Sequence, residues 1–450
     1  MKDISFFFNP KSIAVIGASP IHGKLSNAII RQLRTMEYPG TVYPVNPKYK
    51  SIDSMECYAS LTAIKEDVDV VILCIPAPGV LDAMEDVVKK RVKGAIIVSA
   101  GFKEMGNEGR ILEDKIREIS RETGIRIMGP NCLGVFDNIS KVDTFFILRE
   151  RIKRPQVGGL TILSQSGSFA GTIMDTLAAE GLGVSKIVNY GNRVDVGESD
   201  CLEYITNDES TKIVGLYMES VDDGRRFVEV AKKCAEKKPV FAIKVGKHDA
   251  GASAARSHTG AIAGRYEIYS AAFKKAGIIE MKSYSEFLDA CKILSKHQTT
   301  DGKRVLIITD GGGMGVSVAD VCDEMGLEVN EPSDGLKNIL AQKLPPFCAF
   351  VNPIDLTGSA TDSDYVTALK QGMAEYDVAI VMALWGPPGL TDKLIQMLSD
   401  ASRELNKPVI ICSPGGEYTQ KRNKMFADKG LPVFARPEDA ARAAAILAKV

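Results

Sequence analysis

Short runs rich in valine and isoleucine alternate with helix-like patterns along this sequence of 450 residues. Ser12–Gly17, Thr41–Val45 and Ile213–Met218 are such runs, and glycine, proline or polar residues bound them. Continuous apolar runs of this length are typical of strands that are buried on both faces. Strands that alternate with helices are in turn typical of parallel sheets covered by helices. We therefore predict an α/β protein with parallel sheets.

The alternation falls into three series, which predict three domains at residues 1–145, 155–298 and 303–450. The polar stretches Arg149–Gly159 and His297–Gly302 lie between them, and the first domain is predicted to be Rossmann-like. The strands expected in the first series are Ser12–Gly17, Thr41–Val45, Asp69–Ile75, Gly94–Ser99 and Ile125–Met128. Those of the second are Leu160–Ser164, Val184–Val188, Ile213–Met218 and Val240–Ile243. Those of the third are Arg304–Thr309, Val378–Leu384 and Val409–Cys412.

The composition argues against several classes of protein. The net charge is −1 and no cluster of basic residues is interleaved with aromatic ones, so neither nucleic acid nor an anionic membrane is expected as a partner. The nine cysteines are scattered singly, which predicts neither a disulfide framework nor a metal site. No signal peptide or membrane-spanning run is recognised, so we expect a reduced, cytoplasmic, soluble protein.

A glycine turn follows the first predicted strand, at Ile16-Gly17-Ala18-Ser19. The N–H groups at the start of the next helix, together with nearby serine and lysine side chains, can bind a phosphate. On its own such a turn is a weak signal, because every Rossmann-like unit needs one. The Gly-x-Gly-x-x-Gly fingerprint is absent, and Lys48 rather than an acidic residue follows the second strand. This pattern disfavours NAD and fits coenzyme A best.

Ser164-Gln165-Ser166-Gly167-Ser168 begins the helix after the first strand of the second series. Three hydroxyls at a helix N-terminus favour an oxyanion site, although a single serine cap would explain part of the pattern. Glu219 ends the strand Ile213–Met218. It is either a solvated loop residue or a carboxylate that orients a histidine.

His258 is one of four histidines and lies in Ser257-His258-Thr259-Gly260. Residues 244–264 are rich in glycine, alanine and serine, so a mobile loop is expected there. A neutral imidazole is a nucleophile that can hold a phosphoryl group. A surface histidine in a flexible connection is the alternative.

Taken together, these motifs resemble those of the α subunit of ADP-forming acyl-CoA synthetases, relatives of succinyl-CoA synthetase. Asn46-Pro47-Lys48 and Gly129-Pro130-Asn131-Cys132-Leu133-Gly134 belong to the same set. The resemblance implies a Rossmann-like CoA-binding domain followed by two flavodoxin-like ligase domains. It implies that His258 is the phosphohistidine, that Glu219 orients it and that Ser166, Gly167 and Ser168 hold the phosphate. It places coenzyme A at Gly17, Ser19, Pro20, Gly23, Lys24, Ser26, Lys48, Pro76, Ser99, Ala100 and Asn131.

The reaction implied is acyl-CoA + ADP + phosphate = acid + ATP + CoA, probed best with acetyl-CoA. The resemblance also implies an ATP-grasp β subunit that holds ADP and Mg²⁺, in an α₂β₂ assembly, because no Gly-x-x-x-x-Gly-Lys-Ser/Thr loop occurs in the sequence. In one respect the chain departs from succinyl-CoA synthetase, since Ala170-Gly171 stands where that enzyme has a tyrosine. Another acid such as succinate, an NAD-dependent dehydrogenase, a CoA-binding regulatory protein and a synthetase-like protein acetyltransferase are the alternatives.

Overall fold

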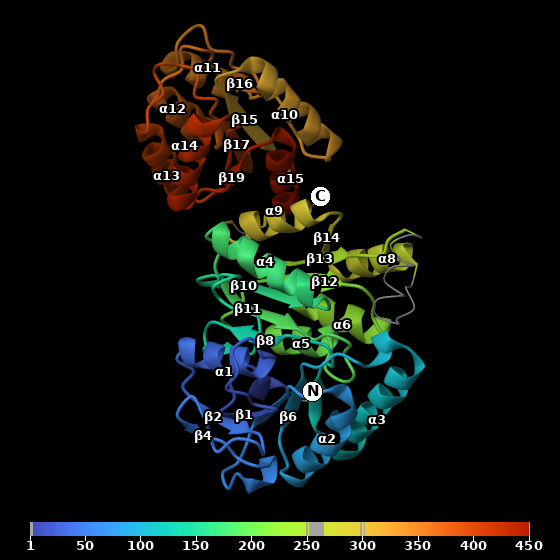
Figure 1. Cartoon of the computed structure of the whole chain (residues 1–450). Coiled ribbons are helices and arrows are strands. Elements are labelled where there is room, and N and C mark those ends of the chain that lie inside the picture. Colours follow the sequence, from blue (N-terminus) through green and yellow to red (C-terminus); the bar gives the residue numbers. More distant parts are fainter. Residues whose placement is uncertain (1–2, 249–250, 252–264, 298, 301, 450) are drawn as a thin grey trace. The chain divides into compact units, whose positions relative to one another are not determined.

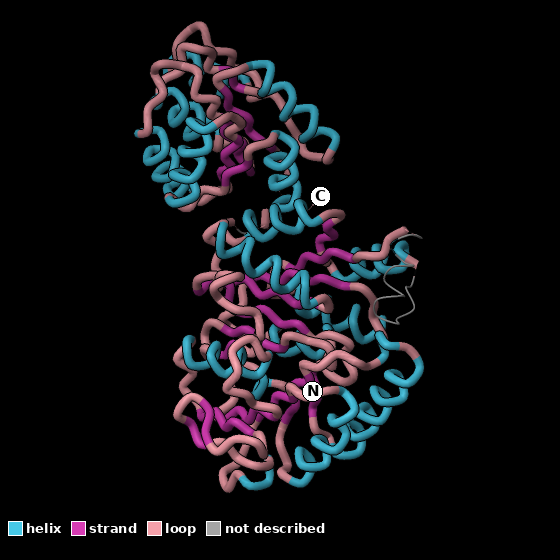
Figure 2. The backbone as a smooth tube through the Cα atoms, in the orientation of Figure 1, coloured by secondary structure: helices cyan, strands magenta, loops and turns pink. Residues whose placement is uncertain are grey.

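The computed structural model describes residues 3–248, 251, 265–297, 299–300 and 302–449. The chain divides into two compact units, Met1–Lys282 and Ser283–Val450, which are described separately (Figure 1). In each unit helices surround the strands (Figure 2). The α/β fold with mostly parallel sheets is therefore confirmed.

The first sheet of unit 1 has the strand order β2-β1-β5-β6-β7, and all its strands are parallel. Its central strands are short and apolar, and β5 is buried along its whole length, as expected for a sheet covered on both faces. The strands are β1 (Ser12–Ile16), β2 (Thr41–Val45), β5 (Val70–Leu73), β6 (Gly94–Ile97) and β7 (Arg126–Met128). The helices are α1 (Leu25–Thr35), α2 (Val80–Lys89) and α3 (Asn107–Thr123), and a small hairpin is formed by β3 (Ser51–Ile52) and β4 (Met55–Glu56).

The second sheet of unit 1 has the order β14-β13-β12-β10-β11-β8-β9. Its parallel strands are β10 (Val157–Ser164), β11 (Val184–Asn189), β12 (Ile213–Met218), β13 (Val240–Lys244) and β14 (Ile279–Met281). Its helices are α4 (Gly167–Ala179), α5 (Glu198–Ile205), α6 (Gly224–Ala235) and α8 (Tyr266–Ala276).

The domain boundary expected at residue 145 differs from the structure. The strands β8 (Gly134–Asp137) and β9 (Val142–Asp143) precede this boundary, yet β8 pairs antiparallel with β11 and β9 with β8. Pairing with β11 covers an edge that would otherwise expose unpaired backbone groups. The expected linker Arg149–Gly159 also differs, because its last residues already belong to β10.

The sheet of unit 2 has the order β16-β15-β17-β18-β19 and is parallel. Helix α9 (Tyr284–Leu294) lies in this unit, where it packs on the C-terminal helix α15 (Pro437–Ala448). The strands are β15 (Val305–Thr309), β16 (Ile354–Asp355), β17 (Val378–Met382), β18 (Val409–Cys412) and β19 (Val433–Phe434). The other helices are α10 (Gly312–Glu324), α11 (Asp334–Lys343), α12 (Asp362–Gly372), α13 (Lys393–Leu405) and α14 (Glu417–Asp428).

One strand order recurs in the parallel part of all three sheets. The first strand in the chain lies between the second and the third, and the fourth and fifth follow outward. Such sheets bind ligands at the carboxyl ends of the strands, where the connections leave the first strand in opposite directions. The turns after β1, β10 and β15 all lie at this position, which matches the similarity between Ile162–Gly167 and Ile307–Gly313 in the sequence.

The two sheets of unit 1 share a buried core and a buried ion-pair cluster. Phe8 stacks on Tyr204 with 4.2 Å between the ring centroids. The guanidinium of Arg126, on β7, donates to Asp195 at 2.8 Å and to Asp200 at 3.0 Å. Burial disfavours the charge of Arg126, but the two carboxylates outweigh that effect and raise its pKa. The start of β7 is thereby held against Asp195 and Asp200.

Among the described residues, no helix combines the length and apolarity needed to span a membrane.

Candidate functional site

The residues expected to contact coenzyme A follow the carboxyl ends of the five parallel strands of the first sheet. Gly17 to Ser26 follow β1, Lys48 follows β2 and Pro76 follows β5. Ser99 and Ala100 follow β6, and Asn131 follows β7. Because all the strands are parallel, the structure brings these residues to one edge of the sheet. Of the predicted residues there, Pro20, Gly23, Lys24, Lys48, Pro76 and Ala100 are exposed, whereas Ser19 and Ser26 are buried.

Gly17 is required by the close approach of two chain segments. It adopts a φ of +81°, and a Cβ atom there would lie 2.6 Å from the carbonyl oxygen of Cys74. Its N–H donates to the carbonyl of Val45 at 3.0 Å, and the Ser19 hydroxyl accepts the N–H of Ile21 at 3.2 Å. The turn is thus fixed before α1 begins at Leu25. The N–H groups of Gly17, Ala18 and Ile21 are therefore used within the turn, and the first N–H groups of α1 are the ones suited to an anion.

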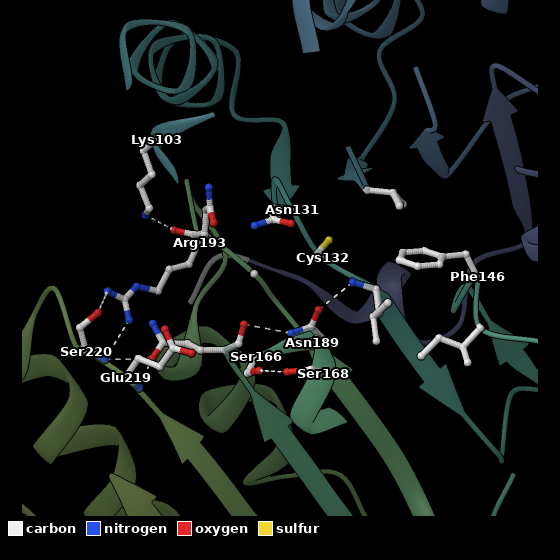
Figure 3. Close-up of a pocket in the computed structure, with 17 residues that line it drawn as sticks. Lys103, Asn131, Cys132, Phe146, Ser166, Ser168, Asn189, Arg193, Glu219 and Ser220 are labelled. Carbon is white, nitrogen blue, oxygen red and sulfur yellow. Dashed lines mark hydrogen bonds between the residues drawn. The ribbon is translucent and has the colours of Figure 1, made fainter. Parts of the chain in front are cut away.

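A cavity of about 390 Å³ lies where the carboxyl edges of the two sheets of unit 1 meet. Figure 3 shows Ser166, Ser168 and Glu219 along one side, with Asn131 and Cys132 opposite them. Burial raises the pKa of the Cys132 thiol, which keeps it protonated at neutral pH. The lining residues are Val98, Lys103, Asn131, Cys132, Leu133, Phe146, Ile147, Gln165, Ser166, Gly167, Ser168, Asn189, Gly191, Asn192, Arg193, Glu219 and Ser220.

The N-terminus of α4 forms the polar side of this cavity. Ser166 is the N-cap residue, and its hydroxyl accepts the N–H of Phe169 at 3.3 Å. The hydroxyls of Ser166 and Ser168 lie 2.9 Å apart. Since the first N–H groups of a helix have no partner within it, the predicted residues Ser166, Gly167 and Ser168 offer donors of the kind that suits an anion. Ser166 is thus the helix cap that the alternative interpretation expects, and the hydroxyl of Ser168 lies beside it.

Gln165 joins this helix start to Glu219. Its side-chain oxygen accepts the N–H of Glu219 at 2.5 Å and that of Ser220 at 3.0 Å. Asn189 supports the same turn from the other side by donating to the carbonyls of Ser164 at 3.0 Å and of Gln165 at 3.1 Å. Glu219 itself is 9% exposed, so it is not the solvated loop residue of the alternative interpretation.

A buried lysine lies behind Glu219. Lys244 is fully buried at the end of β13, and Met218, the neighbour of Glu219, pairs with it across the sheet. Burial lowers the pKa of Lys244, and the charge of Glu219 opposes this shift. Tyr217 stacks on Phe169 with 4.1 Å between the ring centroids, and burial raises its pKa to about 12. The surroundings of Glu219 thus combine the stacked rings of Tyr217 and Phe169 with the cation of Lys244.

Two further cations line the cavity and are held by carboxylates. Arg193 donates to Asp222 at 2.6 Å and to Glu198 at 3.3 Å. Although burial opposes its charge, Glu198 and Asp222 raise the pKa of Arg193. Lys103 donates to the carbonyl of Asn192 at 2.6 Å and forms an ion pair with Glu113 at 3.3 Å. Both charges are therefore already compensated by the protein.

The sequence did not identify all of these residues. Gln165 and Cys132 lie inside motifs named above, so their place at the site could have been predicted from the sequence. Asn189 ends β11, whereas Arg193 and Lys103 lie in connections without a pattern, and only the fold brings the three to the cavity. His258 lies outside the described residues. No group of histidine, cysteine or acidic side chains suited to a metal occurs among the residues that are described.

Three family models match the chain in order. They are a CoA binding domain at residues 11–138, a succinyl-CoA ligase like flavodoxin domain at residues 157–294 and a ligase-CoA domain at residues 305–449. The first corresponds to the sheet that contains β1, the second to the sheet that contains β10 and the third to the sheet of unit 2.

Similar proteins match over nearly the whole chain. The α subunit of ADP-forming acetate–CoA ligase I of Pyrococcus furiosus is 37% identical over 98% of this chain and 96% of its own length. ADP-forming acetate–CoA ligase I of Archaeoglobus fulgidus is 39% identical over 98% of this chain, which spans only 63% of that protein. The solved structure of dinucleotide forming acetyl-coenzyme A synthetase 1 of Ca. Korarchaeum cryptofilum, in complex with phosphate and ADP, has a TM-score of 0.93 at 32% identity, covering 99% of this chain and 96% of that one.

Proposed function

The chain belongs to the family of ADP-forming acetate–CoA ligase α subunits, and from that premise we propose that it catalyses phosphoryl transfer from acyl-CoA and phosphate to His258. The complete reaction is acyl-CoA + ADP + phosphate = acid + ATP + CoA. It requires a second subunit for ADP. Acetyl-CoA is the first substrate to test, because the family is named for acetate.

One cavity carries this proposal. It joins Asn131, at the edge of the CoA binding domain, to the hydroxyls of Ser166 and Ser168 and to the carboxylate of Glu219. A thioester presented from the first sheet would therefore meet a phosphate at the N-terminus of α4. The helix N-terminus stabilises the negative charge that develops on the phosphate oxygens and on the attacked carbonyl oxygen.

The steps balance without any further reagent. An oxygen of phosphate attacks the thioester carbonyl, the carbon–sulfur bond breaks, and CoA leaves as a thiolate that takes up a proton. A ring nitrogen of His258 then attacks the phosphorus of the acyl phosphate, and the carboxylate of the free acid leaves. The phosphohistidine finally transfers its phosphoryl group to the β-phosphate of ADP.

Glu219 orients His258 in this scheme. A carboxylate that accepts the N–H of one ring nitrogen fixes the tautomer and leaves the other nitrogen as the nucleophile. The low exposure of Glu219 supports this role, since a buried carboxylate makes a stronger hydrogen bond than a solvated one. The hydrogen bonds from the N–H groups of Glu219 and Ser220 to the Gln165 side chain hold the backbone of Glu219 in place.

The partner in this proposal is an ATP-grasp β subunit that binds ADP and Mg²⁺, in an α₂β₂ assembly. The sequence contains no Gly-x-x-x-x-Gly-Lys-Ser/Thr loop that would hold a nucleoside diphosphate. A relative whose name specifies an α subunit supports the same division of labour. The domain in unit 2 then serves as structure or as a docking surface for the partner.

Radiolabelled phosphate tests the proposal directly. The purified chain, incubated with acetyl-CoA and labelled phosphate, should acquire one label through a bond that is labile to acid and stable to base. His258→Ala should abolish the label, whereas His248→Ala, a change in a histidine outside the Ser-His-Thr-Gly motif, should retain it. ADP with Mg²⁺ should remove the label as ATP only after the β subunit is added.

Two results would refute this assignment. If His258→Ala still accepts phosphate, the nucleophile is another residue. If the chain alone makes ATP, no second subunit is needed.

A further inference from the structure

A short connecting segment forms the apolar side of the cavity. We define it as the wall segment, Phe146–Arg154, which runs from β9 to β10. Both Phe146 and Ile147 line the cavity. Ser166 and Ser168 supply hydroxyls to the same cavity, whereas Phe146 and Ile147 supply a phenyl ring and a branched butyl side chain.

The wall segment is anchored at the residues that face the cavity. The carbonyl of Ile147 accepts the Gln32 side-chain amide at 3.0 Å and the Arg154 guanidinium at 2.8 Å. Arg154 in turn donates to the fully buried carboxylate of Asp143 at 2.9 Å. Because buried charge-assisted hydrogen bonds are costly to break, the backbone of Ile147 has a fixed position.

Ile147 occupies space that α4 leaves open. Gly171 is buried on this helix, and a Cβ atom there would lie 2.9 Å from Cδ1 of Ile147. Ile152 approaches the same point at 3.7 Å but does not line the cavity. A larger residue at position 171 would displace Ile147. The helix thus supplies the phosphate surface, and the wall segment supplies the boundary for the rest of the substrate.

Both cations of the cavity already have carboxylate partners in the protein. Arg193 is engaged by Asp222 and Glu198, and Lys103 by Glu113 and a backbone carbonyl. The second carboxylate of a dicarboxylic acid would have to compete with the buried carboxylates of Glu198 and Glu113 for these cations, which is unfavourable. An apolar tail against Phe146 and Ile147 incurs no such cost.

We infer that Phe146 and Ile147 determine which acid is accepted, and that they select monocarboxylic acids with a short, apolar tail. The inference rests on the proposed function, because it assigns the apolar side of the same cavity to the acyl group. The acid reaches a length limit where its tail meets the side chain of Ile147.

Truncation of the wall tests the inference. Ile147→Ala and Phe146→Ala, each in the full chain with its β subunit, are compared with wild type on acetate, butyrate, phenylacetate and succinate. A methylene that fits an apolar pocket changes kcat/KM by roughly 10–200-fold. The ratio of kcat/KM for butyrate to that for acetate should therefore rise at least about 10-fold in Ile147→Ala. Succinate should remain a poor substrate in every variant.

Ile152→Ala is the matched control. It removes the same atoms from the same segment beside Gly171, but outside the cavity lining, so the ratio between the acids should stay at the wild-type value. Ile147→Val provides an intermediate case should Ile147→Ala fold poorly. The inference is overturned if folded Ile147 and Phe146 variants keep the wild-type ratio, or if Ile152→Ala shifts it equally, or if succinate is preferred.

A binding measurement separates this inference from the proposed function. Calorimetry with acetyl-CoA and phenylacetyl-CoA reports the fit of the acyl group without turnover. If wild type turns over none of the acids, the proposed function fails. The role of Phe146 and Ile147 is still supported in that case if wild type binds acetyl-CoA more tightly than phenylacetyl-CoA and Ile147→Ala weakens this preference. If turnover occurs but the variants change neither the binding preference nor the ratio of kcat/KM values, only the role of Phe146 and Ile147 is refuted.

Discussion

The side-chain oxygen of Gln165 accepts the backbone N–H of Glu219 at 2.5 Å, although the two residues are 54 positions apart in the chain. The first residue follows β10 and the second follows β12, and these strands are parallel neighbours. One amide side chain therefore couples the helix start that faces a phosphate to the carboxylate proposed to orient His258. The same oxygen also accepts the N–H of Ser220 at 3.0 Å, so two hydrogen bonds join the turns.

Gln165→Ala should slow labelling of His258 from acetyl-CoA and phosphate. The change leaves two backbone N–H groups without their acceptor, at a cost of about 1–3 kcal/mol when such groups are buried. The turn at Glu219 then loosens, and single-turnover labelling should fall by at least roughly 10-fold, since each 1.4 kcal/mol is a factor of ten. Gln165→Glu keeps the acceptor but adds negative charge, so it should mainly raise KM for phosphate. Equal rates in Gln165→Ala and wild type would contradict the coupling.

Glu219→Gln should slow phosphoryl transfer by roughly 10²–10⁴-fold, the usual effect of losing a positioned acid–base partner. The substitution keeps the size of the side chain and removes its charge, so folding should be little affected. Glu229→Gln, on the exposed face of α6, is the control for loss of a carboxylate. Rapid-quench measurement of the phosphorylated chain gives the rate. Wild-type labelling in Glu219→Gln would mean that this carboxylate has no orienting role.

Lys48→Ala should weaken binding of coenzyme A to the chain by roughly 10-fold, because a charged hydrogen bond to phosphate contributes about 1.5–3 kcal/mol. Lys50→Ala removes a second exposed lysine two residues further on and should bind as wild type does. Calorimetry on the two variants measures the difference, and NAD should not bind to either. If NAD binds tightly and coenzyme A does not, the ligand of the first sheet is wrongly assigned.

The stability of unit 2 should increase as pH falls from about 7 to about 5 because of Asp289. Burial, and then the charge of Asp439, raise the pKa of Asp289 from 3.8 to about 6, while Arg442 opposes the shift at 2.8 Å. Between these two values the folded state binds the proton more tightly, so the free energy of unfolding falls as pH rises. One pH unit within this window corresponds to about 1.4 kcal/mol.

Urea titration followed by Trp385, the single tryptophan of the chain, reports unfolding of unit 2. Asp289→Asn should remove about 1 kcal/mol of the pH dependence, since asparagine does not titrate. Asp400→Asn, in an exposed carboxylate of α13, should retain it. An unchanged pH dependence in Asp289→Asn would show that another group is responsible.

Strands with a strong local pattern were predicted well. Thr41–Val45, Ile213–Met218 and Val409–Cys412 begin and end at the predicted residues. The α/β class and the order of the three domain types were also confirmed. These features follow from periodicity and from turn residues, which act over a few neighbouring positions.

Helix α5 (Glu198–Ile205) is an element that no local pattern in the sequence predicts. Its sequence begins with Glu198, Ser199 and Asp200, which have the composition of a polar loop, yet all three residues are buried. Arg193 forms an ion pair with Glu198, and Arg126 and Arg226 with Asp200. A polar helix is stable inside the protein only because distant cations compensate its carboxylates. No local pattern contains that information.

Local patterns in the sequence predict the longer strands, the glycine turns that follow them and residue types suited to phosphate and coenzyme A. The pairing of β8 with the second sheet, the hydrogen bond between Gln165 and Glu219 and the contact of Ile147 with Gly171 are visible only in the folded chain. Propensity and periodicity act over a few neighbouring residues. Strand order and the contacts between connections depend instead on packing between segments that lie far apart in the chain.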